Sequence, residues 1–124
     1  MRLIIAGSRI FNDYKILKCE TTSFIEQLKR KGLLENDEVI IVSGGAKGAD
    51  KLGERYAKEH GYKCEIYFPD WSEGNKAGIL RNIVMGDTSD ACIVFIVNDS
   101  KGSQHMANYA VKKGLFTKLV NCYE

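Results

Sequence analysis

The chain is poor in proline, tryptophan and histidine and lacks the long apolar segments that mark membrane and secreted proteins. Its 124 residues include one proline, one tryptophan and two histidines. The longest apolar run, residues 91–97, is far shorter than the ~20 residues that a membrane-spanning helix needs. The apolar start, MRLIIAG, is too short for a signal peptide. We therefore expect a cytoplasmic protein without a membrane partner.

Neither the charge nor the cysteines point to a particular partner. The 18 basic and 16 acidic side chains leave a net charge of +2, too small to predict a nucleic-acid partner by itself. The four cysteines, at positions 19, 64, 92 and 122, form no C-x-x-C pair and have only two histidines to join them. This spacing does not fit a zinc site, so we expect no metal and four reduced thiols.

What remains is the composition of an ordinary folded domain. Hydrophobic residues make up 44% and charged residues 27% of the chain, which excludes disorder of the whole chain. A chain of this size removes roughly two-thirds of its unfolded surface from water. It fits one domain, which we expect to cover residues 1–124.

Strand-like and helix-like segments alternate along the chain. Short apolar runs predict strands at residues 3–6, 39–42, 62–68, 91–97 and 115–122. Helical periodicity fills the gaps, from 14 to a glycine stop at 32, from 49 to a stop at 61, over 74–85 and over 102–113. Because no hairpin signal joins neighbouring strands, they need crossover connections. This predicts an α/β fold with a five-stranded parallel sheet and helices on both faces.

The polarity of the strands predicts their order. The strands at 3–6, 39–42 and 91–97 are continuously apolar, as expected where both faces of a strand are buried. The other two carry alternating polar residues, as edge strands do. The order 3-2-1-4-5 satisfies this division. It places a topological switch point between the first and fourth strands, where ligands bind in such sheets.

Glycine-rich sequences follow two central strands. Gly7-Ser8-Arg9 offers close backbone approach, a hydroxyl and a cation for phosphate, although three residues alone are better explained as a plain turn. The stretch Ser43-Gly44-Gly45-Ala46-Lys47-Gly48-Ala49-Asp50 leads into a helix N-terminus, which favours an anion. It is neither a P-loop nor a dinucleotide fingerprint, and tight strand–helix packing is its alternative explanation. Asp50 is expected to accept a ribose hydroxyl or to stabilise the helix dipole.

Polar residues also follow the third and fourth predicted strands. Trp71 is suited to stack on a base or to cap the core, and Arg81 and Asn82 lie on the helix after it. A solvated flank of a buried helix face is the commoner explanation for those two. The segment Asn98-Asp99-Ser100-Lys101-Gly102-Ser103-Gln104-His105 opens the last helix and predicts a second anion cradle, with a capped loop as the alternative.

Together these motifs resemble the YspA/cpYpsA-related family of the SLOG superfamily. The resemblance covers essentially the whole chain. It rests on Gly7-Ser8-Arg9 with Phe11 and Asp13, the 43–50 stretch, Asp70-Trp71, Lys76-Ala77-Gly78, Arg81-Asn82 and Ser100-x-Gly102-Ser103-x-His105-Met106. It implies a three-layer Rossmann-like domain of phage or bacterial origin with a nucleotide-related ligand at the strand ends. The superfamily includes LOG-type nucleotide phosphoribohydrolases, the DNA-processing protein DprA and domains thought to sense signals derived from NAD or ADP-ribose.

The chain departs from these relatives at two motifs. LOG-type enzymes carry P-G-G-x-G-T-x-x-E, whose glutamate aids cleavage of an N-glycosidic bond. Residues 100–106 of this chain contain no glutamate, which argues against phosphoribohydrolase activity. The family usually has A-G-P-x-R-N, and Ile79 replaces that proline here. We expect this change to alter only the start of the helix.

These observations support one leading function and two alternatives. The leading hypothesis is a sensor or ligand-binding domain for a nucleotide-derived molecule of the NAD, ADP-ribose or nucleotide class. Its expected ligand-binding residues are Gly7, Ser8, Arg9, Ser43, Gly44, Gly45, Ala46, Gly48, Asp50, Trp71, Arg81, Asn82, Ser100, Gly102 and Ser103. The first alternative is a nucleotide hydrolase that uses Asp50, Asp99 or His105 as acid or base.

The second alternative, favoured least, is DNA binding. Its candidates are the basic residues Lys15, Lys18, Lys29, Arg30 and Lys31 on and after the first helix, for which a solvated helix face is the simpler explanation. Related folds often pair through helices, so a homo-oligomer is a further expectation. The sequence names no cofactor.

Overall fold

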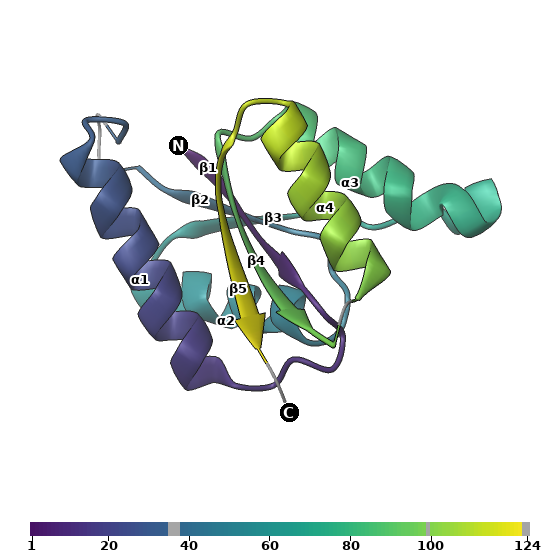
Figure 1. Cartoon of the computed structure of the whole chain (residues 1–124), viewed down its shortest axis with the longest axis horizontal. Helices are drawn as coiled ribbons and strands as arrows, with labels where there is room; N and C mark the ends of the chain where they lie inside the picture. The colour runs from purple at the N-terminus through teal and green to yellow at the C-terminus, as the bar shows by residue number, and fades with distance from the viewer. Residues whose placement is uncertain (35–37, 99, 123–124) are drawn as a thin grey trace.

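The described part of the chain, residues 1–34, 38–98 and 100–122, builds one sheet of five parallel strands in the middle of this computed structural model. The strands are β1 (Arg2–Gly7), β2 (Ile40–Ser43), β3 (Lys63–Ile66), β4 (Ala91–Val97) and β5 (Phe116–Cys122). Their order is β3-β2-β1-β4-β5, and each neighbouring pair is parallel. The predicted sheet and strand order are confirmed (Figure 1).

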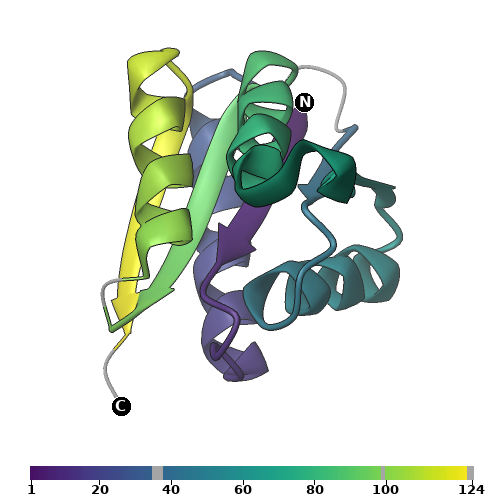
Figure 2. The ribbon, with the colours of Figure 1, turned by 90° about the vertical axis from the view of Figure 1, so that its right-hand side faces the viewer.

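Within the same residues, α-helices cover the sheet in pairs. α1 (Tyr14–Arg30) and α2 (Ala49–His60) pack on one face, and α3 (Ala77–Asp87) and α4 (Lys101–Lys112) pack on the other. Figures 1 and 2 show this arrangement from two directions. A short 3-10 helix, η1 (Trp71–Lys76), precedes α3. The fold therefore has the three layers that the alternating elements predict.

Alternating side chains along the central strands divide the core in two. In β1, Leu3 and Ile5 are buried against α1 and α2. Ile4 and Ala6 point the other way and are buried with residues of α3 and α4. β4 is buried along its whole length because it has a strand on either side and helices over both faces. The edge strands β3 and β5 keep exposed side chains, as their alternating polarity predicts.

The structure corrects two predicted boundaries. β3 covers Lys63–Ile66 instead of 62–68, because its only neighbour, β2, offers just four residues for pairing. The predicted helix over 74–85 begins at Ala77, because Gly74 has a left-handed φ of 69° that breaks the helical path. The segment before this break forms η1. Both corrections lie at the carboxyl edge of the sheet and affect the loops of that edge.

The carboxyl edge of the sheet carries the loops that the sequence analysis singled out. The register pairs Gly7 of β1 with Phe95 of β4, so the two strands end side by side. The Gly7-Ser8-Arg9 turn therefore lies beside the loop that leads into α4, as the strand order predicts. The loop after β2 leads into α2 at the same edge.

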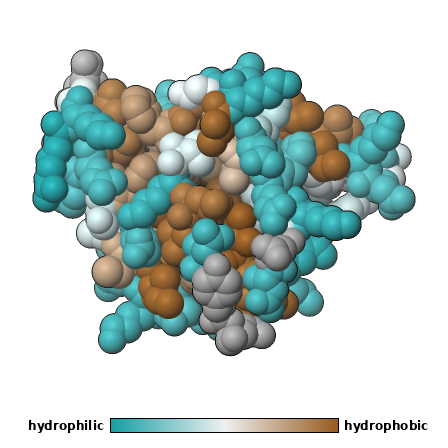
Figure 3. Space-filling model, viewed as in Figure 1, coloured by the Kyte–Doolittle hydropathy of each residue, from teal (hydrophilic) through white to brown (hydrophobic). Residues whose placement is uncertain are grey.

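The face seen in Figure 1 has an apolar centre. Edge strand β5 leaves Phe116 and Leu119 partly exposed. Figure 3 shows hydrophobic surface in the middle of this face and hydrophilic surface at both sides. Among the described residues, no helix combines the length and apolar character that crossing a membrane requires. The expected homo-oligomer stays a prediction.

Candidate functional site

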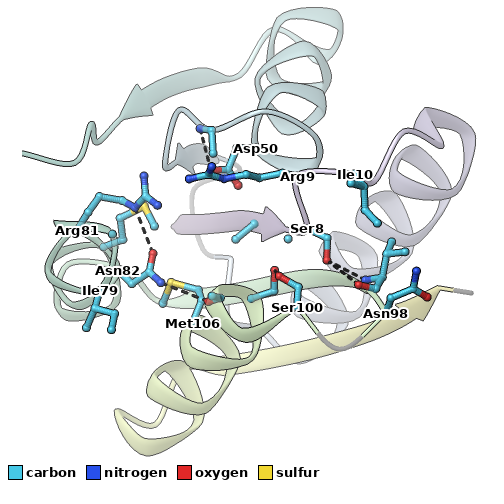
Figure 4. A pocket seen from close by; sticks show the side chains of 18 of the residues that line it. Ser8, Arg9, Ile10, Asp50, Ile79, Arg81, Asn82, Asn98, Ser100 and Met106 are labelled. Carbon is cyan, nitrogen blue, oxygen red and sulfur yellow. Dashed lines mark hydrogen bonds between the residues drawn. The ribbon is translucent and has the colours of Figure 1, made fainter. Parts of the chain in front are cut away.

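A cavity of about 550 Å³ opens at the carboxyl edge, beside the ends of β1 and β4 (Figure 4). Its walls come from the loop after β1, the loop before α2, the helix α3 and the start of α4. Most of the predicted site residues line it, namely Gly7, Ser8, Arg9, Ala46, Asp50, Arg81, Asn82, Ser100, Gly102 and Ser103. The cavity thus lies at the switch point of the sheet, where this fold class binds ligands.

Ser8 ties the loop after β1 to the end of β4. Its Oγ accepts a hydrogen bond from the Val97 N–H at 2.8 Å, and its own N–H donates to the Phe95 carbonyl oxygen at 2.9 Å. The Ser8 carbonyl oxygen accepts from the Ala49 N–H at the start of α2. Ser8 is buried, so these bonds hold three elements together at the floor of the cavity.

Two glycines allow the backbones at this junction to approach closely. At Gly7 an added Cβ would overlap the Phe95 carbonyl oxygen, and at Gly48 it would overlap the Ser8 carbonyl oxygen. Gly48 also has a left-handed φ of 77° and forms the N-cap of α2. It lies outside the lining of the cavity. Gly48 therefore permits tight packing of α2 on the loop after β1. This is the alternative to anion binding that the sequence offered for the 43–50 stretch.

Asp50, in the first turn of α2, is a buried carboxyl group that faces the cavity. Its Oδ2 accepts a hydrogen bond from the Ala46 N–H at 3.1 Å, which closes the loop before the helix. Burial raises the pKa of Asp50 from 3.8 to about 6, although the Ala46 N–H and the positive charges of Arg81 and Arg9 oppose this rise. The group therefore titrates close to neutral pH.

Arg81 of α3 closes the cavity opposite Asp50. Its guanidinium donates to the carbonyl oxygen of Gly44, and its Nε donates to Asn82 Oδ1 at 3.2 Å. At Gly44 an added Cβ would lie 2.8 Å from Asp50 Oδ2 and 2.9 Å from Arg81 Nη1, so a larger residue there would displace one of the two charged side chains. Burial lowers the pKa of Arg81, and the nearby Asp50 carboxylate opposes this effect.

The start of α4 forms the wall facing the loop after β1. Ser100 is the N-cap, but its side chain bonds no backbone N–H and instead lies 3.1 Å from Ser103 Oγ. The N–H groups of the first helical turn are therefore available to an anion. Asn82 Nδ2 reaches across from α3, 3.5 Å from the Gly102 carbonyl oxygen and 3.4 Å from His105 Nδ1. His105 lies behind Asn82 and does not line the cavity.

The remaining predicted residues are placed differently. Gly44, Gly45 and Trp71 line a second, adjoining cavity of about 420 Å³. Ser43 lines neither cavity; its buried Oγ accepts from the Gly45 N–H at 3.1 Å and donates to Glu54 Oε2 at 2.8 Å. Asp99, a candidate acid or base, lies outside the described residues.

The apolar part of the lining was not predicted from the sequence. Met85 and Met106 are buried at the base of the cavity, and Ile10 and Ile79 lie exposed at its rim. Apolar helix positions that face a cavity have the same spacing as those that face the core, so the pattern carries no signal for them. Asn98, by contrast, belongs to the predicted second anion cradle; it lines the cavity at the end of β4 and has a left-handed φ of 52°. Such backbone strain in a residue other than glycine is frequent at binding sites.

The structure also bears on metal ligands and on the DNA-binding alternative. Within residues 1–34, 38–98 and 100–122, no three His, Cys, Asp or Glu side chains cluster as metal ligands would. The candidate basic residues for DNA binding lie at opposite ends of the 17-residue α1. Lys15 and Lys29 are about 21 Å apart along its axis, so the group does not form one compact patch.

Comparisons with known proteins identify the family. The family described as YspA, cpYpsA-related SLOG matches residues 1–74. The Gene 61 protein of Mycobacterium phage D29 is 32% identical over 121 residues, which cover 92% of this chain and 91% of that protein. No solved structure matches the chain. On the family match, the fold and the position of the cavity, the chain belongs to the YspA/cpYpsA-related SLOG family.

Proposed function

We propose that the chain binds a nucleotide-derived small molecule of the NAD, ADP-ribose or nucleotide class, as a sensor or ligand-binding domain. One observation carries the proposal: two helix N-termini and two arginines converge on a single cavity at the switch point of the sheet. Backbone N–H groups and guanidinium groups together are suited to phosphate. The volume of about 550 Å³ is in the range of small-molecule sites.

Arg9 is the side chain best placed to meet the anionic part of the ligand. It lines the cavity, is exposed, and makes no salt bridge in the part of the chain that the structure describes. Arg81, by contrast, already donates to Gly44 and Asn82. The charge of Arg9 is therefore free to pair with a phosphate, while Arg81 adds its field from a fixed position.

Asp50 and Asn82 are suited to the hydroxyl groups of a ribose. Only Oδ2 of Asp50 takes a hydrogen bond within the described residues, so Oδ1 is left to accept one from a sugar hydroxyl. The amide of Asn82 offers both donor and acceptor atoms. Met85 and Met106 supply an apolar surface on which the carbon skeleton of a sugar would pack.

A thermal-shift panel of NAD, ADP-ribose, AMP, ATP and cyclic nucleotides tests the proposal. A ligand at a hundredfold excess over its dissociation constant stabilises a protein by about 2.7 kcal/mol, which gives a clear rise in melting temperature. Titration calorimetry should then show that Arg9→Gln weakens binding at least about tenfold. Lys58→Gln, the same charge change in the last turn of α2, should leave the affinity unchanged. A panel without any shift contradicts the proposal for those compounds.

One observation favours a second function, hydrolysis of the bound nucleotide. Asp50 is buried in the cavity wall and its pKa is raised to about 6, which suits a general acid or base near neutral pH. Incubation with the same compounds and chromatography of the mixture would reveal turnover, and Asp50→Asn should abolish it. An unchanged mixture after several hours contradicts this second function.

A further inference from the structure

The second cavity adjoins the first along a shared wall. Arg9 and Ala46 line both of them, so a ligand group bound at Arg9 lies next to both cavities. The other residues that line the second cavity are Gly44, Gly45, Lys47, Phe68, Pro69 and Trp71. The smaller cavity is thus built from the loops after β1, β2 and β3, further from α4 than the first.

Two aromatic rings stand exposed at this second cavity. Phe68 is 69% and Trp71 65% exposed. Leaving large apolar rings in water is unfavourable, and neighbouring exposed aromatic side chains at a cavity are typical of a surface that a ligand covers. Isolated surface apolar residues need no such explanation, but these two line the same hollow.

Local contacts fix the Phe68 ring and the backbone that carries Trp71. At Gly45 an added Cβ would lie 2.9 Å from Phe68 Cε1, so the Phe68 ring rests directly on the glycine backbone. Asp70 is the N-cap of η1, and its Oδ1 accepts from the N–H of Ser72 at 3.0 Å and from Ser72 Oγ at 2.6 Å. The backbone of Trp71 lies within this capped turn. A ligand would therefore lose little free energy in ordering the Phe68 ring.

The charges at the second cavity favour an anion. Arg9 and Lys47 line it, and no acidic side chain does. Neither cation forms a salt bridge in the described residues. A ligand that fits both the rings and the charges has a planar ring system and a negatively charged group next to it.

We propose that Phe68 and Trp71 form the subsite for the planar base of a nucleotide whose phosphate lies against Arg9, between the two cavities. The ribose that meets Asp50 and Asn82 is then the one on the far side of the phosphate groups, as in ADP-ribose, and AMP occupies only the second cavity and Arg9. The inference rests on the proposed function and narrows it. It assigns the ligand to compounds that carry a nucleobase and excludes simple sugar phosphates. Gly45 belongs to this subsite as the residue on which the Phe68 ring packs.

Titration calorimetry with two matched probes tests the subsite. AMP carries base, sugar and phosphate, whereas ribose 5-phosphate lacks only the base. The wild-type protein should bind AMP at least about tenfold more tightly. Phe68→Ala and Trp71→Ala should each weaken AMP binding about 5- to 150-fold, as expected for one stacked base, and leave ribose 5-phosphate binding unchanged. Phe116→Ala removes a partly exposed ring on β5 and should change neither affinity.

The chain provides a second, independent readout. Trp71 is its only tryptophan, so the emission reports on this subsite alone when the indole is excited selectively over the six tyrosines. A base stacked on the indole should quench the emission as AMP or ADP-ribose is added. Ribose 5-phosphate should leave the emission unchanged at concentrations that saturate the protein in calorimetry.

The outcomes separate the subsite from the proposed function. If neither AMP, ADP-ribose nor ribose 5-phosphate binds the wild type, the proposed function is overturned for these compounds and the subsite with it. If AMP binds but both alanine variants keep its affinity and the emission does not change, the subsite alone is overturned. Phe68 and Trp71 are both exposed, so both alanine variants are expected to fold. Circular dichroism should show that each variant is folded before its affinity is compared.

Discussion

Replacement of Asp50 by asparagine should remove a loss of stability that the wild-type protein undergoes as the pH rises. Asp50 is buried, and its pKa is raised from 3.8 to about 6. The folded state therefore holds the proton more tightly than the unfolded state. The contribution of Asp50 to stability is therefore fully present below pH 3.8 and is lost as the pH rises to about 6, because its carboxyl group ionises more readily in the unfolded chain than inside the protein. The whole difference corresponds to about 3 kcal/mol.

Asparagine keeps the shape of the side chain and removes the titration. Its oxygen can still accept the hydrogen bond from the Ala46 N–H. Linkage gives the wild-type Asp50 a loss of about 1 kcal/mol by about pH 4.5 and of about 3 kcal/mol by about pH 7.5. The free energy of unfolding of Asp50→Asn, measured relative to wild type, should therefore rise by about 2 kcal/mol over this range.

Urea denaturation at several pH values, followed by circular dichroism, measures this difference. Asp70→Asn serves as the control, because Asp70 is exposed and hydrogen bonds from Ser72 lower its pKa. The carboxyl group of Asp70 titrates below the pH range of the experiment. The difference in free energy of unfolding between Asp70→Asn and wild type should therefore stay constant across that range. A constant difference for Asp50→Asn as well would refute the reasoning, since Asp50 would then ionise like an exposed aspartate.

The structure makes three further predictions. Gly48→Ala should destabilise the fold by about 3 kcal/mol or more and Gly61→Ala by about 1 kcal/mol in thermal denaturation, because both have left-handed φ but only Gly48 also meets a backbone oxygen; equal losses would contradict the close contact. Ser8→Ala should cost about 1–3 kcal/mol in urea denaturation, because it leaves a buried N–H at the end of β4 unpaired; a loss below about 0.5 kcal/mol would argue against that bond. Iodoacetamide should label exposed Cys19 in the native protein and spare Cys92, whose burial raises its thiol pKa. Mass spectrometry measures the two rates of labelling, and equal rates would show that the reagent reaches Cys92.

The fold was predictable because its signals are local and repeated. The continuous apolar run of β4 and the alternating polarity of β5 sufficed to place one strand inside the sheet and the other at its edge. The same holds for the cavity wall that follows β1, since strand order decides which loops meet. Gly7-Ser8-Arg9 and Ser100 therefore came together as expected.

The second cavity depended on information that the sequence does not express locally. Phe68 was predicted as a strand residue, but β3 ends at Ile66 because β2 offers it no further partner. The release of Phe68 into a loop is thus a property of the neighbouring strand. The contact between Arg81 and Gly44 joins residues 37 positions apart, and no local pattern indicates it. Met106 fits the core periodicity of α4 and gave no sign that it also faces a cavity.

The glycine contact between α2 and the loop after β1 also determines how relatives can diverge. No side chain fits at Gly7 or Gly48, so substitutions at these positions cannot reshape the side of the cavity that the loop after β1 and the start of α2 form. The opposite wall is free to vary, because Ile79 is 46% exposed and an added Cβ at Gly102 would meet open space. A lineage that adopts a new ligand is therefore expected to change α3 and the start of α4 and to keep the β1–α2 junction.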